Sequence, residues 1–214
     1  MGKVRVAAYS VSIDGFAAGP KQDINNPLGV RGLELHAWFF HTAVFHQIQG
    51  TDGGNRGIDN DFAMQSFKNV GAWIIGRNMF GPVRGPWQDD AWKGWWGENP
   101  PFHTPVFVLT HCERTLLNMD GGTAFHFVTE GPETALTRAK EAAGERDVRI
   151  GGGVSTLRQY LLAGHIDELH LAVSPVLLGE GESLFADLDL SKLGFSVTKS
   201  VAGEKATHVL LQKK

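Results

Sequence analysis

Cysteine is almost absent from this sequence, and its scarcity removes several kinds of site. Cys112 is the only cysteine among 214 residues. One thiol forms no intrachain disulfide and cannot build a zinc or iron–sulfur centre that depends on several cysteines. No base is evident in the sequence to pair with Cys112, so we interpret it as a small buried residue rather than a nucleophile.

Long apolar runs and strong basic runs are missing as well. No apolar stretch reaches the ~18–20 residues that span a bilayer, and the sequence leads directly into a predicted strand without the apolar core of a signal peptide. We therefore expect a cytoplasmic protein that does not enter a membrane. The chain has 20 Lys and Arg against 23 Asp and Glu, and its longest basic run is the Lys213–Lys214 pair. This charge distribution does not favour nucleic-acid binding.

Metal-binding patterns are also missing. The sequence contains no H-E-x-x-H motif. His36, His41 and His46 are spaced by five residues, which on a helix turns each side chain ~140° from the last. Because the three rings would not share one helix face, we expect no metal site.

Glycine, in contrast, is abundant, with 27 residues, and it separates short apolar runs from amphipathic segments. Strands that alternate with helices and end as antiparallel pairs are typical of one α/β domain. We therefore predict a single domain over residues 1–214, with a mixed, mostly parallel sheet flanked by helices and a C-terminal antiparallel hairpin. The expected strands cover residues 4–11, 72–75, 106–109, 125–128, 148–150 and 166–176, the helices 33–48, 59–69, 132–143 and 155–163, and the hairpin 195–201 with 207–212.

Three polar or glycine-rich turns follow apolar strands of this sheet, at residues 76–79, 110–111 and 151–153. Ligands of open α/β sheets bind at the carboxyl ends of the parallel strands, so we expect the three turns to converge on one anion-binding edge. Arg77 would supply a forked cation there, and Thr110 and Ser155 would supply hydroxyls. The alternative is that each glycine only makes a tight turn.

Two well-known nucleotide-binding fingerprints do not occur in this chain. No G-x-G-x-x-G follows the first strand, and there is no G-x-x-x-x-G-K-[ST]. Neither a Rossmann fold nor a P-loop is therefore supported, and a nucleotide site at these turns would be of another design.

An ordered set of segments covers nearly the whole chain. They are residues 10–16, 74–80, 106–110, 148–153, 166–169, 175–179 and 184–185. In this order they resemble the dihydrofolate-reductase-like superfamily, and within it the reductase domain of the bifunctional riboflavin-biosynthesis deaminase–reductase and its stand-alone relatives. Residues 20–58 and 81–104 have no counterpart in the set and look like insertions.

The resemblance implies NADPH as cofactor, bound by the same three turns. It assigns residues 76–79 and 152–156 to the phosphates, residues 110–111 to the neighbourhood of the 2′-phosphate, and the backbone of Ser10 and Val11 to the nicotinamide. The loop from Ala17 would cover the ring. The full set of implied cofactor residues is Ser10, Val11, Ala17, Gly76, Arg77, Asn78, Met79, Thr110, His111, Gly151, Gly152, Gly153, Val154, Ser155 and Thr156.

The resemblance also suggests a proton donor. In the folate enzymes it is an acid on the helix before the strand that ends in Gly-Arg, and Asp61 is the best match. A carboxylate held against apolar neighbours such as Phe62 would have a raised pKa and could relay a proton. The alternative is that Asp59 and Asp61 only stabilise the start of a helix.

A tryptophan-rich segment, residues 86–96, lies in the second insertion. Trp87 and Trp92 offer large flat surfaces with one N–H donor each. They could wall a pocket for a planar heterocycle, form a subunit interface, or anchor the long loop to the core.

Two departures count against dihydrofolate as the natural substrate. Ala172 appears where the folate enzymes place a threonine that supports the acid, and residues 100–105 lack the arginine that binds the folate tail. We therefore expect an NADPH-dependent reductase for a small heterocyclic substrate of the 5-amino-6-(5-phosphoribosylamino)uracil class. The family resemblance also suggests a homodimer. The alternatives are dihydrofolate reductase activity and an NADP-binding protein without turnover.

Overall fold

The chain divides into two compact units, each described here by itself. The computed structural model describes residues 2–81, 85–87 and 91–214. Unit 1 consists of residues 1–5 and 69–165, and unit 2 of residues 6–68 and 166–214. Strand β1 (Val4–Ser12) begins in unit 1 and continues into unit 2. That residues 1–214 form one domain stays a prediction.

Unit 1 contains a mainly parallel sheet. Its strand order is β7 (Asp147–Gly152), β3 (Val70–Gly76), β4 (Pro105–Leu109), β6 (Ala124–Val128) and β5 (Leu117–Asn118). The pairs β7–β3, β3–β4 and β4–β6 are parallel, and β5–β6 is antiparallel. All residues of β3 are buried, as expected for a parallel strand covered on both faces.

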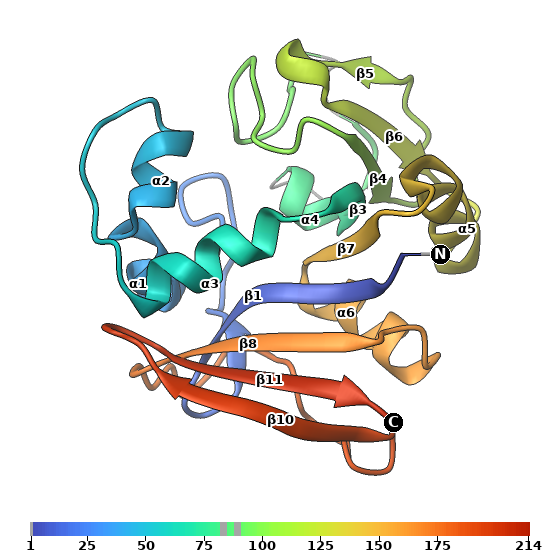
Figure 1. Ribbon diagram of the computed structural model, residues 1–214. Helices are drawn as coiled ribbons and strands as arrows, with labels where there is room; N and C mark the ends of the chain where they lie inside the picture. The colour runs from blue at the N-terminus through green and yellow to red at the C-terminus, as the bar shows by residue number, and fades with distance from the viewer. Residues whose placement is uncertain (1, 82–84, 88–90) are drawn as a thin grey trace. The chain divides into compact units, whose positions relative to one another are not determined.

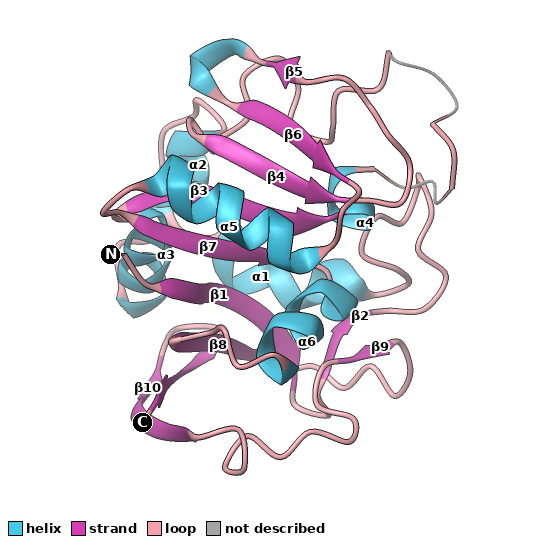
Figure 2. Ribbon diagram, turned by 90° about the vertical axis from the view of Figure 1, so that its right-hand side faces the viewer, coloured by secondary structure: helices cyan, strands magenta, loops and turns pink. Residues whose placement is uncertain are grey.

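Helix α5 (Pro132–Ala143) lies across β3, β4 and β7 in unit 1, as Figure 2 shows. Pro132 stands in its first turn, where a missing N–H costs nothing, and Ala135, Leu136, Ala139 and Ala143 form its buried stripe. The remaining helices of the unit are α4 (Arg77–Phe80), the 3₁₀ turn η2 (Asp120–Gly122) and α6 (Val154–Leu162).

Unit 2 contains four neighbouring strands, and two of their pairings are antiparallel. Its strand order is β10 (Phe195–Ala202), β11 (Thr207–Lys213), β8 (Glu168–Ser174) and β1, with β10–β11 and β11–β8 both antiparallel. Figure 1 shows the red β10–β11 hairpin beside β8. The predicted C-terminal hairpin is therefore confirmed. A second small sheet pairs β2 (Phe16–Ala18) with β9 (Glu182–Ser183).

The single helix expected over residues 33–48 is wrong. The structure has three pieces, η1 (Gly32–His36), α1 (Ala37–Phe40) and α2 (Ala43–Ile48). The break lies at Thr42, whose backbone is extended and whose Oγ1 accepts from Phe45 N at 3.1 Å. Thr42 also forms a bridge with Asn55, so it caps a new helix instead of continuing the old one.

The other helix of unit 2, α3 (Ile58–Phe67), agrees with the expectation. Its Ala63 packs in a buried cluster with Trp38, Ala172 and Ala206. The predicted fold class, a mixed and mostly parallel sheet flanked by helices with a C-terminal hairpin, is confirmed. Only the short strands β2, β5 and β9 were not expected. No helix in the described parts of the chain has the length and apolar character needed to cross a membrane.

Candidate active site

The three turns predicted from the sequence leave the sheet of unit 1 at the same edge. In the register of the parallel strands, Gly76 of β3 is opposite Leu109 of β4, and Ile75 is opposite Gly152 of β7. Residues 76–79, 110–111 and 151–153 therefore begin at neighbouring strand ends. The expected convergence of the turns is confirmed, whereas their role in binding stays a prediction.

Glycine is required where two of these turns touch. A Cβ on Gly76 would overlap Thr156 Oγ1 and would lie 3.2 Å from Gly153 N. A Cβ on Gly151 would lie 2.9 Å from Ile75 Cγ2. The turns after β3 and β7 thus pack closely because both positions lack a side chain.

Gly153 has the opposite environment. A Cβ there would meet nothing within 4 Å, and the peptide bond that joins it to Gly152 is cis. Gly153 is also the N-cap of α6, and no side chain caps this helix or places an acid in its first turn. The first N–H groups of an α-helix carry partial positive charge and lack intrahelical partners, which suits an anion. Buried Val154 and Thr156 and exposed Ser155 follow.

Arg77 holds its charge beside an aromatic ring. Its guanidinium carbon lies 3.4 Å from the centroid of the Trp87 ring, and its Nε has no hydrogen-bond partner among the described residues. Burial lowers the pKa of Arg77, and the nearby Arg114 lowers it further. Stacking therefore orients this cation, while its Nε is buried without a hydrogen-bond partner among the described residues.

Arg114 is a candidate that the sequence reasoning missed. Its guanidinium carbon lies 4.7 Å from the same Trp87 ring, and its Nη2 donates to the carbonyl oxygen of Trp92 at 2.6 Å. Two guanidinium groups thus share one indole. The sequence signal was available, because Arg114 lies four residues after Thr110, which belongs to a turn already singled out.

The two indoles anchor the tryptophan-rich segment. Trp87 Nε1 donates to the carbonyl oxygen of Cys112, and Trp92 Nε1 to that of Phe80, both at 3.0 Å. Trp87 also packs edge-on against Phe80 and Phe127. Of the three interpretations, anchoring is therefore present, and the roles of pocket wall and subunit interface stay predictions.

The remaining predicted residues of unit 1 lie in the same turns. Thr110 is buried, and its Oγ1 accepts from Cys112 N at 3.2 Å, so this hydroxyl holds the turn. His111 is exposed. Asn78 and Met79 lie on α4 and are half-buried. Cys112 is half-buried rather than buried as expected, because it lies on this surface turn.

The predicted nicotinamide residues lie in unit 2. Ser10 and Val11 are buried in β1, and Ser10 Oγ accepts from Trp38 Nε1 at 2.9 Å. Ala17 is buried in β2. The burial of these residues is consistent with backbone contacts to a ligand, which remain predictions.

Asp61 does not have the surroundings that the sequence suggested. It is exposed in the first turn of α3, while its neighbour Phe62 is buried. The expectation that Asp61 is held against apolar neighbours is therefore wrong, because the helix turns residue 61 outward. The buried acid of the same turn is Asp59, which accepts from His208 Nε2 and from Lys205 N, both at 2.8 Å. The role of Asp61 as proton relay stays a prediction.

The comparison with protein families agrees with this geometry. The model of the RibD C-terminal domain matches residues 4–209. The chain belongs to the RibD C-terminal domain family. The resemblance inferred from the ordered motifs is confirmed, and the chain is a reductase that resembles the riboflavin-pathway enzyme.

Individual relatives are more distant. The uncharacterized protein YyaP of Bacillus subtilis (strain 168) is 26% identical over 140 residues, which cover 61% of this chain and 68% of YyaP. A putative riboflavin biosynthesis protein from Shewanella sp. PV-4 is 21% identical, with a TM-score of 0.60 and coverage of 100% and 99%. Dihydrofolate reductase from Enterococcus faecalis, solved with NADP(H), is 16% identical, with a TM-score of 0.51 and coverage of 99% and 96%. The two structures share the fold of this chain.

Proposed function

We propose that this chain is an NADPH-dependent reductase that transfers hydride to a small heterocyclic substrate of the 5-amino-6-(5-phosphoribosylamino)uracil class. The observation that carries the proposal is the convergence of three turns at one sheet edge of unit 1. That edge combines an uncapped helix start with an arginine whose Nε lacks a partner among the described residues. Such a set of donors fits a ligand with several phosphates.

The residues of unit 1 would bind the phosphates. The N–H groups at the start of α6, beside the open space at Gly153, would hold the pyrophosphate. Arg77, stacked on Trp87, would direct its guanidinium group at the 2′-phosphate. Thr110 would keep its turn in place and bring His111 near the same phosphate.

The residues of unit 2 would act on the reacting end. NADPH supplies the hydride when bound, so the protein has only to orient the ring and exclude water. The backbone of Ser10 and Val11 would bind the carboxamide, and the loop from Ala17 would cover the ring. Asp61 would hold the proton that the substrate takes up.

Fluorescence titration tests cofactor binding directly, because Trp87 lies against Arg77. We expect NADPH to quench tryptophan emission and to bind more tightly than NADH. Arg77→Ala should weaken NADPH by about 50-fold and NADH only slightly, since a charged hydrogen bond to the 2′-phosphate is lost.

A matched control is Arg138→Ala, which removes an exposed arginine of the same unit that pairs with Glu130. It should leave both affinities unchanged. Equal losses for NADPH and NADH in Arg77→Ala would move Arg77 to the pyrophosphate, and no loss would overturn its placement. Failure of the wild type to bind either nucleotide would overturn the proposed function.

Turnover separates the substrate classes. Loss of NADPH absorbance should occur with a phosphoribosylamino-pyrimidine and not with dihydrofolate. Asp61→Asn should lower kcat without changing the Kd of NADPH if Asp61 relays the proton. Tight NADPH binding without turnover of any pyrimidine or pterin would favour a binding protein.

The resemblance to the riboflavin reductases also supports a homodimer in the cytoplasm. Light scattering of the purified chain tests the first part. A mass of one chain at micromolar concentration would contradict it.

A further inference from the structure

A line of hydrogen bonds joins four elements of unit 2. The N–H of Ala8 in β1 donates to His170 Nδ1 of β8 at 3.0 Å, and His170 Nε2 lies 3.0 Å from His208 Nδ1 of β11. His208 Nε2 lies 2.8 Å from Asp59 Oδ1 of α3. As whole residues, His208, Asp59 and His170 are 0%, 4% and 8% exposed. We call Asp59, His208 and His170 the histidine chain.

The sheet register brings the two rings together. His170 is opposite Leu210, and His208 is opposite Ala172, so the two histidines are diagonal neighbours on one face of β8 and β11. Their separation in sequence is 38 residues, and Asp59 is 149 residues from His208. The three residues of the histidine chain are therefore brought together by the fold and not by a local sequence motif.

The backbone N–H at one end fixes the direction of every bond. Because an amide N–H only donates, His170 Nδ1 must be unprotonated, and a neutral ring then carries its proton on Nε2. That proton is donated to His208 Nδ1, so His208 in turn carries its proton on Nε2 and donates it to the Asp59 carboxylate. One arrangement satisfies all three bonds, with two neutral Nε2–H rings and an ionised acid.

An additional proton would break this arrangement. Protonation of His208 would direct Nδ1–H at the Nε2–H of His170. If His170 changed tautomer to accept it, its Nδ1–H would oppose the N–H of Ala8. Either event places two donors face to face in a buried site, which costs the desolvation of an unpaired polar group.

Packing around the chain favours the neutral rings. Phe62 stacks on His208 with centroids 4.1 Å apart, and Trp38 meets the same ring edge-on at 5.2 Å. Burial lowers the pKa of His208, against the opposing effects of Asp59 and Glu204. Lys199 Nζ, a charged group of β10, lies 5.8 Å from the centroid of the Phe62 ring.

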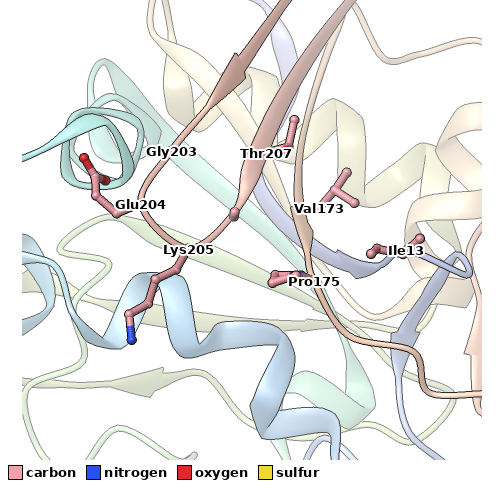
Figure 3. A pocket seen from close by; sticks show the side chains of 8 residues that line it. Ile13, Val173, Pro175, Gly203, Glu204, Lys205 and Thr207 are labelled. Atoms are coloured by element: carbon pink, nitrogen blue, oxygen red, sulfur yellow. The ribbon is translucent and has the colours of Figure 1, made fainter.

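At its acidic end, the chain joins α3 to the β10–β11 turn. Asp59 Oδ2 accepts from Lys205 N, while the Glu204 carboxylate accepts from Ile58 N and Asp59 N, each at 2.9 Å. Glu204 thus caps a helix whose own N-cap, Gly57, has no side chain. Figure 3 shows Glu204 turned toward α3 and Lys205 turned away, at a surface hollow of about 270 Å³.

At its other end, the chain holds an unusual backbone conformation. Ala8 has φ of +54° in the middle of β1, a left-handed conformation that is unfavourable for an L-residue. Its N–H bonds to His170. Two residues further along β1 is Ser10, whose hydroxyl accepts from Trp38, the same indole that packs on His208.

We propose that the histidine chain is a positioning device for β1: it holds Ala8 in its left-handed conformation and thereby aims the backbone of Ser10 and Val11 at the nicotinamide. The consequence for the cofactor rests on the proposed function. Because the chain ends in a backbone N–H, which cannot pass on a proton, it does not supply the proton of the reaction. His170, His208 and Asp59 act through β1.

The protonation pattern can be tested without any ligand. Long-range ¹H–¹⁵N spectra of labelled protein should show Nδ1 unprotonated and Nε2 protonated for both His170 and His208. The pattern at His208 should persist as the pH falls through about 6.5, the ordinary histidine value, because burial lowers the pKa of this ring. A proton on Nδ1 of either ring near neutral pH would contradict the proposed hydrogen-bond pattern of the histidine chain.

A pair of variants at one position tests the positioning role. His170→Asn keeps an acceptor near Ala8 N, whereas His170→Leu has a similar volume and no acceptor. We expect His170→Leu to raise the Kd of NADPH by about 10-fold and His170→Asn to restore most of the loss. The Kd of 2′-phospho-ADP-ribose, which lacks the nicotinamide, should stay unchanged in both.

The outcomes separate this inference from the proposed function. Equal losses for NADPH and 2′-phospho-ADP-ribose, or equal behaviour of the two variants, would overturn the positioning role. His41→Gln, an exposed histidine of the same unit, serves as the control for labelling and folding. If wild-type protein bound neither ligand, the proposed function would fail. In that case amide exchange at Ala8 would still test whether the histidine chain holds β1. His170→Leu should then speed amide exchange at Ala8, and His170→Asn should not.

Discussion

Unit 1 and unit 2 each gather polar groups in a largely apolar setting, but in opposite ways. In unit 1, Arg77 and Arg114 share the Trp87 ring, and Arg77 Nε has no partner among the described residues. In unit 2, by contrast, the polar side-chain atoms of the histidine chain all have hydrogen-bond partners. These atoms are both ring nitrogens of His170 and of His208 and both carboxylate oxygens of Asp59. A half-buried cation is costly to keep and is stabilised when an anion arrives. A saturated chain has nothing to offer a ligand and gives rigidity instead.

The difference predicts that removing the acid of the histidine chain lowers stability, whereas removing an arginine beside Trp87 changes the binding of an anion. Asp59→Asn should have the largest effect. The site needs two acceptors, for His208 Nε2–H and for Lys205 N–H, and an amide supplies one. We expect the free energy of unfolding to fall by about 3 kcal/mol, measured by urea denaturation.

Asp52→Asn is the matched control, because Asp52 is an exposed carboxylate of the same unit. It should leave the urea midpoint unchanged. Equal midpoints for Asp59→Asn and the wild type would show that the histidine chain contributes no stability, and the contrast between the two units would disappear.

Two glycines separate packing from binding within unit 1. A methyl group at Gly76 would overlap Thr156, whereas one at Gly153 would enter open space. We expect Gly76→Ala to lower the free energy of unfolding by about 2 kcal/mol and Gly153→Ala to leave it nearly unchanged. Gly153→Ala should still weaken NADPH, because its methyl group would occupy the space where the pyrophosphate approaches α6.

Thermal melts and NADPH titrations of both glycine variants decide this prediction. Equal destabilisation by the two alanines would mean that the space at Gly153 is not open in solution. Unchanged NADPH affinity in Gly153→Ala would remove the start of α6 from the proposed site.

The same contrast explains what sequence reasoning could reach. The turns of unit 1 were predictable because each follows a short apolar strand, and parallel strands place such turns at one edge. The histidine chain could not be predicted, because Asp59 and His208 are 149 residues apart and neither belongs to a spaced motif. Helix 33–48 failed for a local reason, since Thr42 accepts from Phe45 N and starts a new helix. Asp61 was chosen by its match to the acid of the folate enzymes, and that match did not show that Asp59, rather than Asp61, is the buried acid of this turn.

The smallest effect is expected at Arg114, the cation that sequence reasoning missed. Arg114 lowers the pKa of Arg77 and lies over the same ring. Arg114→Gln keeps a donor near the carbonyl oxygen of Trp92 but removes one positive charge from the site. The loss of a partly exposed charge is worth about 1 kcal/mol, or roughly a fivefold loss of NADPH affinity at low salt.

Because a partly exposed charge is screened by salt, the loss in Arg114→Gln should shrink as salt rises. The loss in Arg77→Ala should persist, because it is the loss of a direct hydrogen bond. A salt-independent loss in Arg114→Gln would instead make Arg114 a direct ligand of the phosphate, and the anion site of unit 1 would then contain two arginines in place of one.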